Sequence, residues 1–164
     1  MPEVFVLVER KNSLLAKFFS TFMVVLTVIF VLLATLNFVF MIPALLLSVV
    51  CVVLRAFLHR EFEYSYFDGD VRFARITNKS RRKALQGYSM EEVLQIAPAG
   101  DRSMHKYEND SQVKKKDYTS GIHNVPYYEM AVKTTNGISL IKFEPDDKYL
   151  DAVCMKFPQK VIRK

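Results

Sequence analysis

The sequence of 164 residues lacks the patterns that most reactive sites need. It has only two cysteines, Cys51 and Cys154, and neither lies in a CxxC or other metal-ligand spacing. Its three histidines, His59, His105 and His123, are far apart in the chain. No glycine-rich phosphate loop, nucleophile elbow or HExxH motif occurs in the sequence. The sequence therefore predicts no enzyme, and neither a metal site nor a cofactor site.

Charge is absent from a long stretch near the start of the chain. Residues 18–54 contain no Asp, Glu, Lys, Arg or His, and an uncharged apolar run longer than about 18 residues is typical of a membrane-spanning helix. One helix of this length would measure about 55 Å, against about 30 Å for the hydrocarbon core of a bilayer. Asn37 and Pro43 interrupt the run near its middle. The sequence therefore predicts a transmembrane helical hairpin over residues 14–58, with spans near 14–36 and 43–58.

The missing charges also bear on transport and on orientation. Proton relays and carriers need polar or ionisable groups at membrane depth, so transport by a single copy is not predicted. Basic residues flank the uncharged run on both sides: Arg10, Lys11 and Lys17 before it, and Arg55 and Arg60 after it. Under the positive-inside rule, this distribution places both termini in the cytoplasm.

The net charge of +6 is moderate and spread along the chain. Because no basic motif interleaved with aromatic residues occurs, nucleic acid is not a predicted partner. A moderate positive excess suits a domain that is held against an anionic membrane surface. The predicted partners are therefore the lipid bilayer and either an anionic lipid or a protein.

The segment before the hairpin, residues 1–13, fits two structures. Val4, Leu7, Val8 and Lys11 have the spacing of a helix that lies at the membrane interface, whereas residues 3–8 are equally rich in strand formers. We expect an N-terminal interfacial segment that touches the cytoplasmic domain.

After the hairpin, the pattern changes to the alternation of polar and apolar residues that is typical of strands. A turn signal at Asp68-Gly69 predicts a β-hairpin over residues 61–78, and Asn136-Gly137 predicts another. Between them, a long polar loop covers residues 101–121. Within this loop, the sequence predicts one helical turn at residues 103–108. The remaining predicted strands are 84–88, 93–97, 115–119, 127–135 and 138–143.

The last predicted element is a helix. Pro145 fits its first turn, acidic residues at 144, 146 and 147 suit its positive end, and Lys156 suits its last turn. Its apolar stripe has the spacing i, i+3, i+4 and i+7 and faces a core. This stripe consists of Leu150, Val153, Cys154 and Phe157.

Three stretches resemble an uncharacterised family of small two-span bacterial membrane proteins with a C-terminal pleckstrin-homology-like (PH-like) domain. They are MPEVFV at the start, EYSYFDGDVRFARITNKSRRK in the middle and FEPDDKYLDAVCMKFPQKVI at the end. The resemblance implies a membrane α-helical hairpin and, over residues 59–164, an α+β cytoplasmic domain of mainly antiparallel strands. That domain would be a bent barrel capped by its C-terminal helix. The family offers no catalytic residues to carry over.

Two basic runs are candidate contacts for lipid headgroups. Lys79, Arg81, Arg82 and Lys83 place four cations in five positions, and each is worth about 1 kcal/mol near an anionic surface. The second run is Lys114, Lys115 and Lys116. The alternative for both runs, which the sequence favours over lipid contact, is a solvated loop or a reinforcement of the positive-inside charge near the membrane.

These patterns predict a non-enzymatic PH-like module anchored in the bacterial cytoplasmic membrane, which presents a protein- or lipid-contact surface at the cytoplasmic face. The alternative is an accessory subunit of a larger transport or secretion complex, whose transmembrane hairpin is the interaction surface. Exchange of the hairpin for an unrelated one separates the two hypotheses.

Overall fold

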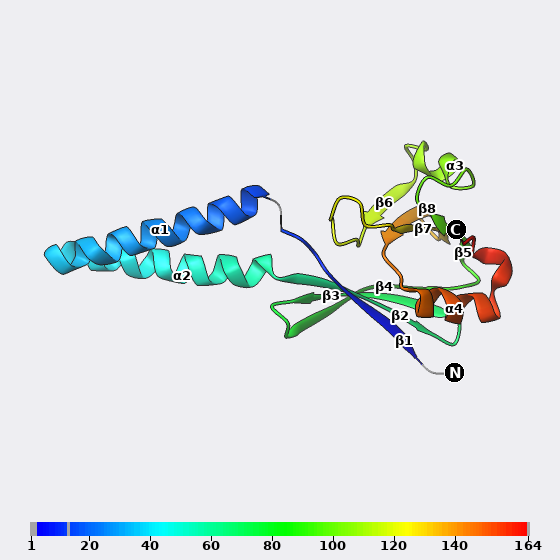
Figure 1. Ribbon diagram of the computed structural model, residues 1–164, viewed down its shortest axis with the longest axis horizontal. Helices are drawn as coiled ribbons and strands as arrows, with labels where there is room; N and C mark the ends of the chain where they lie inside the picture. Colours follow the sequence, from blue (N-terminus) through cyan, green and yellow to red (C-terminus); the bar gives the residue numbers. More distant parts are fainter. Residues whose placement is uncertain (1–2, 13, 164) are drawn as a thin grey trace.

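Two long apolar helices extend side by side from the rest of the molecule in the computed structural model, which describes residues 3–12 and 14–163 (Figure 1). Helix α1 (Leu14–Leu36) has the predicted bounds, and α2 (Met41–Leu58) begins two residues before the predicted 43. Pro43 is tolerated there because a first-turn N–H has no partner within the helix. Both helices are long and apolar enough to cross a membrane.

The turn between the helices is closed by Asn37 and a short 3-10 helix, η1 (Phe38–Phe40). The side-chain oxygen of Asn37 accepts a hydrogen bond from the backbone N–H of Val39 at 3.1 Å. This cap satisfies one of the donors that a helix start leaves unpaired, which is why an uncharged turn can reverse the chain.

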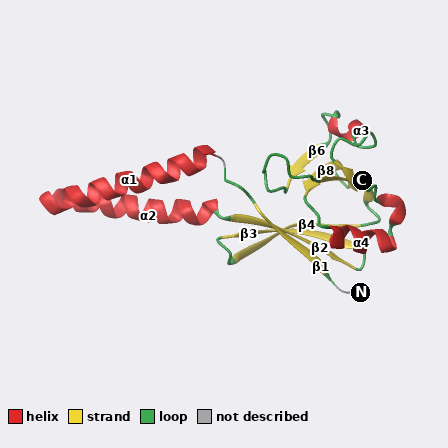
Figure 2. Ribbon diagram, in the orientation of Figure 1, coloured by secondary structure: helices red, strands yellow, loops and turns green. Residues whose placement is uncertain are grey.

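The segment before α1 is a strand, and its partner lies beyond the hairpin. Strand β1 (Val4–Glu9) pairs antiparallel with β2 (Arg60–Phe67), from Val4 opposite Tyr66 to Glu9 opposite Glu61. The sequence allowed either a strand or an interfacial helix in this segment. The structure shows the strand, so the prediction of a helix is wrong. The helical hairpin is an insertion between two neighbouring strands of one sheet (Figure 2).

The strands form two four-stranded sheets. The first has the order β1-β2-β3-β4, with β3 at Asp70–Thr77 and β4 at Arg81–Ser89. The second has the order β5-β7-β8-β6, and a single helical turn, α3 (His105–Glu108), lies in the long polar loop. Its strands are β5 (Val93–Pro98), β6 (Lys114–Asp117), β7 (Tyr128–Thr134) and β8 (Gly137–Phe143). The predicted strands are all present, but β6 pairs with β8 in parallel, which the sequence did not predict.

Aromatic rings fill the space between the sheets. The ring centroids of Tyr64, Phe73 and Phe143 lie 5.6–5.9 Å apart in edge-to-face arrangements, which suit the ring quadrupoles. Helix α4 (Asp147–Lys156) lies at the end of the sheets opposite the hairpin (Figure 1). The sheets do not close into a continuous barrel, but two sheets with a capping helix agree with the predicted fold.

Helix α4 is capped by Asp146, whose carboxylate accepts a hydrogen bond from the Tyr149 N–H at 2.8 Å. Pro145 therefore lies one residue before the N-cap. The prediction that it occupies the first turn of the helix is wrong, because the helix begins later than predicted. Leu150 and Val153 of the predicted stripe are buried, and Cys154 and Phe157 are partly buried against the same core. Tyr149 is also fully buried there, which the stripe did not predict.

The chain after α4 is fixed to the second sheet by a lysine. Lys160, at the end of the 3-10 helix η2 (Pro158–Lys160), donates to the carbonyl of Met90 at 2.5 Å and to that of Val93 at 2.8 Å. Two residues later, the Ile162 N–H donates to the Ile96 carbonyl at 2.8 Å. The ammonium thus joins the turn before β5 to the last residues of the chain.

We expect Lys160→Met to lower the free energy of unfolding by about 1–3 kcal/mol, because part-buried carbonyls would lose a charged donor. The measurement is denaturant unfolding of the full chain in detergent. Lys148→Met removes the same charge from an exposed position on α4 and should change the value by less than about 0.5 kcal/mol. Equal effects of the two substitutions would contradict the role of Lys160.

Candidate functional site

The first basic run lies at the foot of the helical hairpin. Lys79 is in the turn between β3 and β4, and the neighbouring Asn78 N–H donates to the His59 carbonyl, just after α2, at 2.9 Å. Arg81, Arg82 and Lys83 lie on β4 rather than in the predicted loop, and all three are exposed. We call these four basic residues the basic tip. If the helices cross the bilayer, the basic tip faces the headgroups.

One member of the basic tip is held by a partner within the first sheet. The Nε of Arg82 donates to Glu63 of β2 at 3.1 Å, and a second guanidinium nitrogen bonds the same carboxylate. Planar bidentate pairs of this kind are among the stronger charge-assisted hydrogen bonds. The charge of Arg82 is therefore largely compensated, and Lys79, Arg81 and Lys83 remain the candidates for lipid contact.

The second basic run lies on β6 and does not join the first. Lys116 donates to the Tyr88 hydroxyl at 3.0 Å and also bonds Gln86, both on β4 of the other sheet. Gln86 is five residues beyond Arg81, about 16 Å along a strand. The ammonium of Lys116 therefore connects β6, an edge strand of the second sheet, to β4, an edge strand of the first. Lys114 and Lys115 are exposed.

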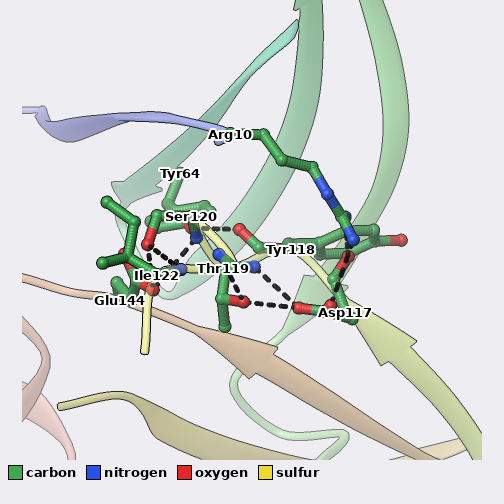
Figure 3. Close-up of polar contacts among 9 residues, drawn as sticks. Arg10, Tyr64, Asp117, Tyr118, Thr119, Ser120, Ile122 and Glu144 are labelled. Atoms are coloured by element: carbon green, nitrogen blue, oxygen red, sulfur yellow. Dashed lines mark hydrogen bonds and ion pairs between the residues drawn. The ribbon is translucent and has the colours of Figure 1, made fainter. Parts of the chain in front are cut away.

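The residues between β1 and α1 are bound to a loop of the second sheet (Figure 3). Arg10 donates to the Asp117 carbonyl at 3.2 Å and forms an ion pair with its carboxylate at 3.3 Å. The Lys11 N–H donates to the Ser120 carbonyl at 2.8 Å, and the Arg10 guanidinium lies 5.6 Å from the centre of the Phe62 ring. These contacts fix residues 10 and 11, just before α1.

The loop itself, residues 117–124, is held by hydrogen bonds of its buried Thr119 and Ser120 and of neighbouring side chains. The Asp117 carboxylate accepts from Thr119, and the Glu144 carboxylate accepts from the Ser120 N–H at 3.0 Å and its hydroxyl at 2.8 Å. The Tyr64 hydroxyl donates to the Tyr118 carbonyl. Burial raises the pKa of Tyr64, so this hydroxyl stays a neutral donor. The sequence prediction gave this loop no role, although Asp117 two residues before Thr119 is a side-chain-to-backbone turn signal.

A cavity of 660 Å³ opens between this loop, the residues before α1 and the hairpin; we call it the junctional cavity. The basic side chains that line it are Arg10, Lys11 and Arg60, together with the imidazole of His123. Its apolar lining comes from the first turn of α1, the last turn of α2 and Ile122. None of the described residues that line it is acidic.

An ion pair between a buried carboxylate and a partly exposed lysine lies in the second sheet next to this loop. Glu129 of β7 has no exposed surface, and its carboxylate is 3.4 Å from the Lys142 ammonium on β8. Lys142 in turn stands opposite Asp117 in the parallel pairing of β6 and β8. Burial, and then the nearby Glu108, raise the pKa of Glu129. The sequence analysis missed this pair; a lone Glu in the apolar strand Tyr128–Thr134 was the available signal.

Within residues 3–12 and 14–163, no group of three or more His, Cys, Asp or Glu could hold a metal ion. Cys51 and Cys154 are both free thiols. The arrangement at the foot of the hairpin combines cations, an apolar wall and a rigid loop, which is the composition of a site for an anion with an apolar part.

Comparison with known proteins agrees with this architecture. The family model described as Bacterial PH-like domain (DUF6106) matches residues 2–163, so β1, both apolar helices, the two sheets and α4 all fall within the matched range. No curated protein and no solved structure matches the chain. Because the matched range is nearly the whole chain, the protein belongs to the bacterial PH-like domain family DUF6106.

Proposed function

We propose that this protein is a non-enzymatic module that the helical hairpin anchors in the bacterial cytoplasmic membrane, and that its two sheets present a contact surface at the cytoplasmic face. The observation that supports this most directly is the insertion of the hairpin between β1 and β2. Because both ends of the hairpin continue into paired strands, the sheets stand at the membrane surface with little freedom to leave it.

The charges at the foot of the hairpin support contact with anionic lipid. The turn that contains Lys79 is hydrogen-bonded to His59 at the end of α2, and Arg81 and Lys83 follow that turn on β4. Each cation near an anionic surface contributes about 1 kcal/mol. Within this proposal the basic tip sets the tilt of the sheets on the membrane, and the faces away from it are open to a protein partner.

Labelling of single cysteines tests the orientation. In a Cys51→Ser, Cys154→Ser background, we expect Val39→Cys, in the exposed turn of the hairpin, to react with an impermeant maleimide in intact cells. Asn136→Cys, in the exposed β7–β8 turn, should react only after the cells are opened. Labelling of Asn136→Cys in intact cells would place the sheets outside and reject the proposal.

Crosslinking in cells, read by mass spectrometry, tests the contact surface. We expect crosslinked partners to be retained when residues 14–58 are replaced by an unrelated apolar hairpin, because the sheets carry the surface. Loss of every partner in that chimera, with correct insertion and folding, would favour the accessory-subunit hypothesis instead.

A further inference from the structure

We propose that the junctional cavity holds the phosphate group of one anionic phospholipid, whose acyl chains run along α1 and α2. This inference rests on the proposed function, because it needs the hairpin to lie in a bilayer. It concerns one bound lipid molecule in a defined cavity, which is different from loose contact between the basic tip and many headgroups.

The three basic side chains of the cavity come from two distant places in the chain. Arg10 and Lys11 follow β1, Arg60 begins β2, and all three line the cavity. Arg10 is positioned by Asp117 and Phe62, whereas Lys11 is exposed and its backbone is fixed by Ser120. None of the described lining residues is acidic, and three of them are basic, a composition that favours an anion; Asp117, 3.3 Å from Arg10, offsets part of the charge of that guanidinium.

The first turn of α1 adds to this potential. Leu14 and Ala16 line the cavity, and the first turn of this 23-residue helix contains no acidic residue. The positive end of a helix dipole, equivalent to about half a charge, therefore faces the cavity and favours an anion there.

The apolar wall decides between a lipid and a soluble phosphate. Leu14, Leu58 and Ile122 line the same cavity, and 43% of Ile122 is exposed. A free phosphate would leave this wall in water, whereas the glycerol and first methylene groups of a phospholipid would cover it. The apolar surfaces of α1 and α2 continue from the cavity along the path that the acyl chains would follow.

The size and origin of the cavity agree with a single ligand. Its 660 Å³ lie within the range of about 300–1,000 Å³ that is usual for small-molecule sites. Two of its walls are the start of α1 and the end of α2, so the cavity exists only because the hairpin is inserted at this point of the sheet.

Native mass spectrometry of the full chain, released from nanodiscs, tests the inference. The nanodiscs contain phosphatidylcholine alone or with phosphatidylglycerol, and a third sample in phosphatidylcholine receives soluble glycerol phosphate. We expect one retained phosphatidylglycerol per chain, with neither phosphatidylcholine nor glycerol phosphate retained. The pair Lys11→Gln with Arg60→Gln should weaken retention about tenfold or more, as expected for lost charged hydrogen bonds.

Two further variants control for charge and for folding. Lys133→Gln with Lys148→Gln removes the same charge from exposed positions outside the cavity and should retain the lipid. Ala16→Phe keeps every charge and fills the cavity, so it should lose the lipid. Near-ultraviolet circular dichroism of the eight tyrosines checks that each variant is folded.

Several results would overturn the inference. They are equal retention of the two phospholipids, retention of glycerol phosphate, and no retained lipid at all. A further one is a loss of lipid in Lys133→Gln with Lys148→Gln as large as in Lys11→Gln with Arg60→Gln. Any of these can occur while Asn136→Cys is still labelled only in opened cells. Failure of the junctional cavity is thus distinguishable from failure of the membrane-anchored module.

Discussion

Replacing Tyr149 with alanine is expected to lower the free energy of unfolding by about 3–5 kcal/mol, the usual cost of truncating a large buried aromatic residue. Tyr149 has no exposed surface, and its ring lies 6.1 Å from those of Phe143 and Tyr66. The cavity left behind would separate α4 from both sheets, because this ring lies between them. Denaturant unfolding in detergent, followed by the circular dichroism of the remaining tyrosines, measures the loss.

Tyr149→Phe is the matched control, and it should leave stability unchanged or raise it by about 1 kcal/mol. The Tyr149 hydroxyl is buried and has no hydrogen-bond partner among the described residues. Burial raises its pKa, so the hydroxyl is neutral throughout the accessible pH range. Removing an unpaired buried hydroxyl avoids a desolvation cost while the ring contacts remain. A loss as large as that of Tyr149→Ala would show that the hydroxyl, and not the ring, fixes α4.

The elements that sequence predicted well are those set by local chemistry. The bounds of α1 follow from a continuous apolar run, and the turn at Asn37 from a side chain that bonds a backbone group two residues away. The turns at Asp68-Gly69 and Asn136-Gly137 need left-handed backbone, and Asp68, Gly69 and Gly137 adopt it. In each case the signal and the structure lie within a few residues of one another.

Pairing over long distances could not be predicted in the same way. Strand β1 pairs with a strand more than fifty residues later, and nothing in residues 3–8 distinguishes that partner from the membrane interface. The parallel pairing of β6 with β8 has the same cause, because polar Lys114–Asp117 has no alternating pattern. Such contacts depend on the packing of the whole domain.

In the candidate site too, local sequence predicted some features, whereas contacts between distant residues could not be predicted. Composition found the basic runs, but Arg82 and Lys116 are bound by Glu63, Gln86 and Tyr88, which only the folded chain brings near. The junctional cavity depends on residues near 10, 60 and 122, which are distant in sequence. The position of a charge in the chain does not determine whether it is available to a ligand.

Replacing Lys142 with methionine is expected to lower the free energy of unfolding by about 3 kcal/mol at neutral pH. The Glu129 carboxylate would lose the ammonium 3.4 Å away, and it has no exposed surface through which water could compensate. Breaking one side of a buried ion pair is costly for this reason, whereas replacing both sides often is not. Adding Glu129→Gln to Lys142→Met should therefore recover most of the loss.

The pH dependence of unfolding tests the same pair with a defined sign. Burial raises the pKa of Glu129 above its ordinary value of 4.5, so between the two values the folded chain holds a proton that the unfolded chain has released. Stability should therefore fall as pH rises from 4.5 through the raised pKa, where the carboxyl group ionises in the folded chain.

Three variants, each compared with the unmodified chain, separate this contribution from those of other carboxyl groups. Lys142→Met removes the charge that lowers the pKa of Glu129, so the fall in stability should extend to higher pH. Glu129→Gln removes the titrating group, so the fall in stability between pH 4.5 and the raised pKa should disappear. The neighbouring Glu108 raises the pKa of Glu129, so Glu108→Gln should narrow the pH range over which stability falls. If Lys142→Met and the unmodified chain show the same pH profile, the Lys142 ammonium and the Glu129 carboxylate are not coupled, and the pair does not contribute to the pH dependence of stability.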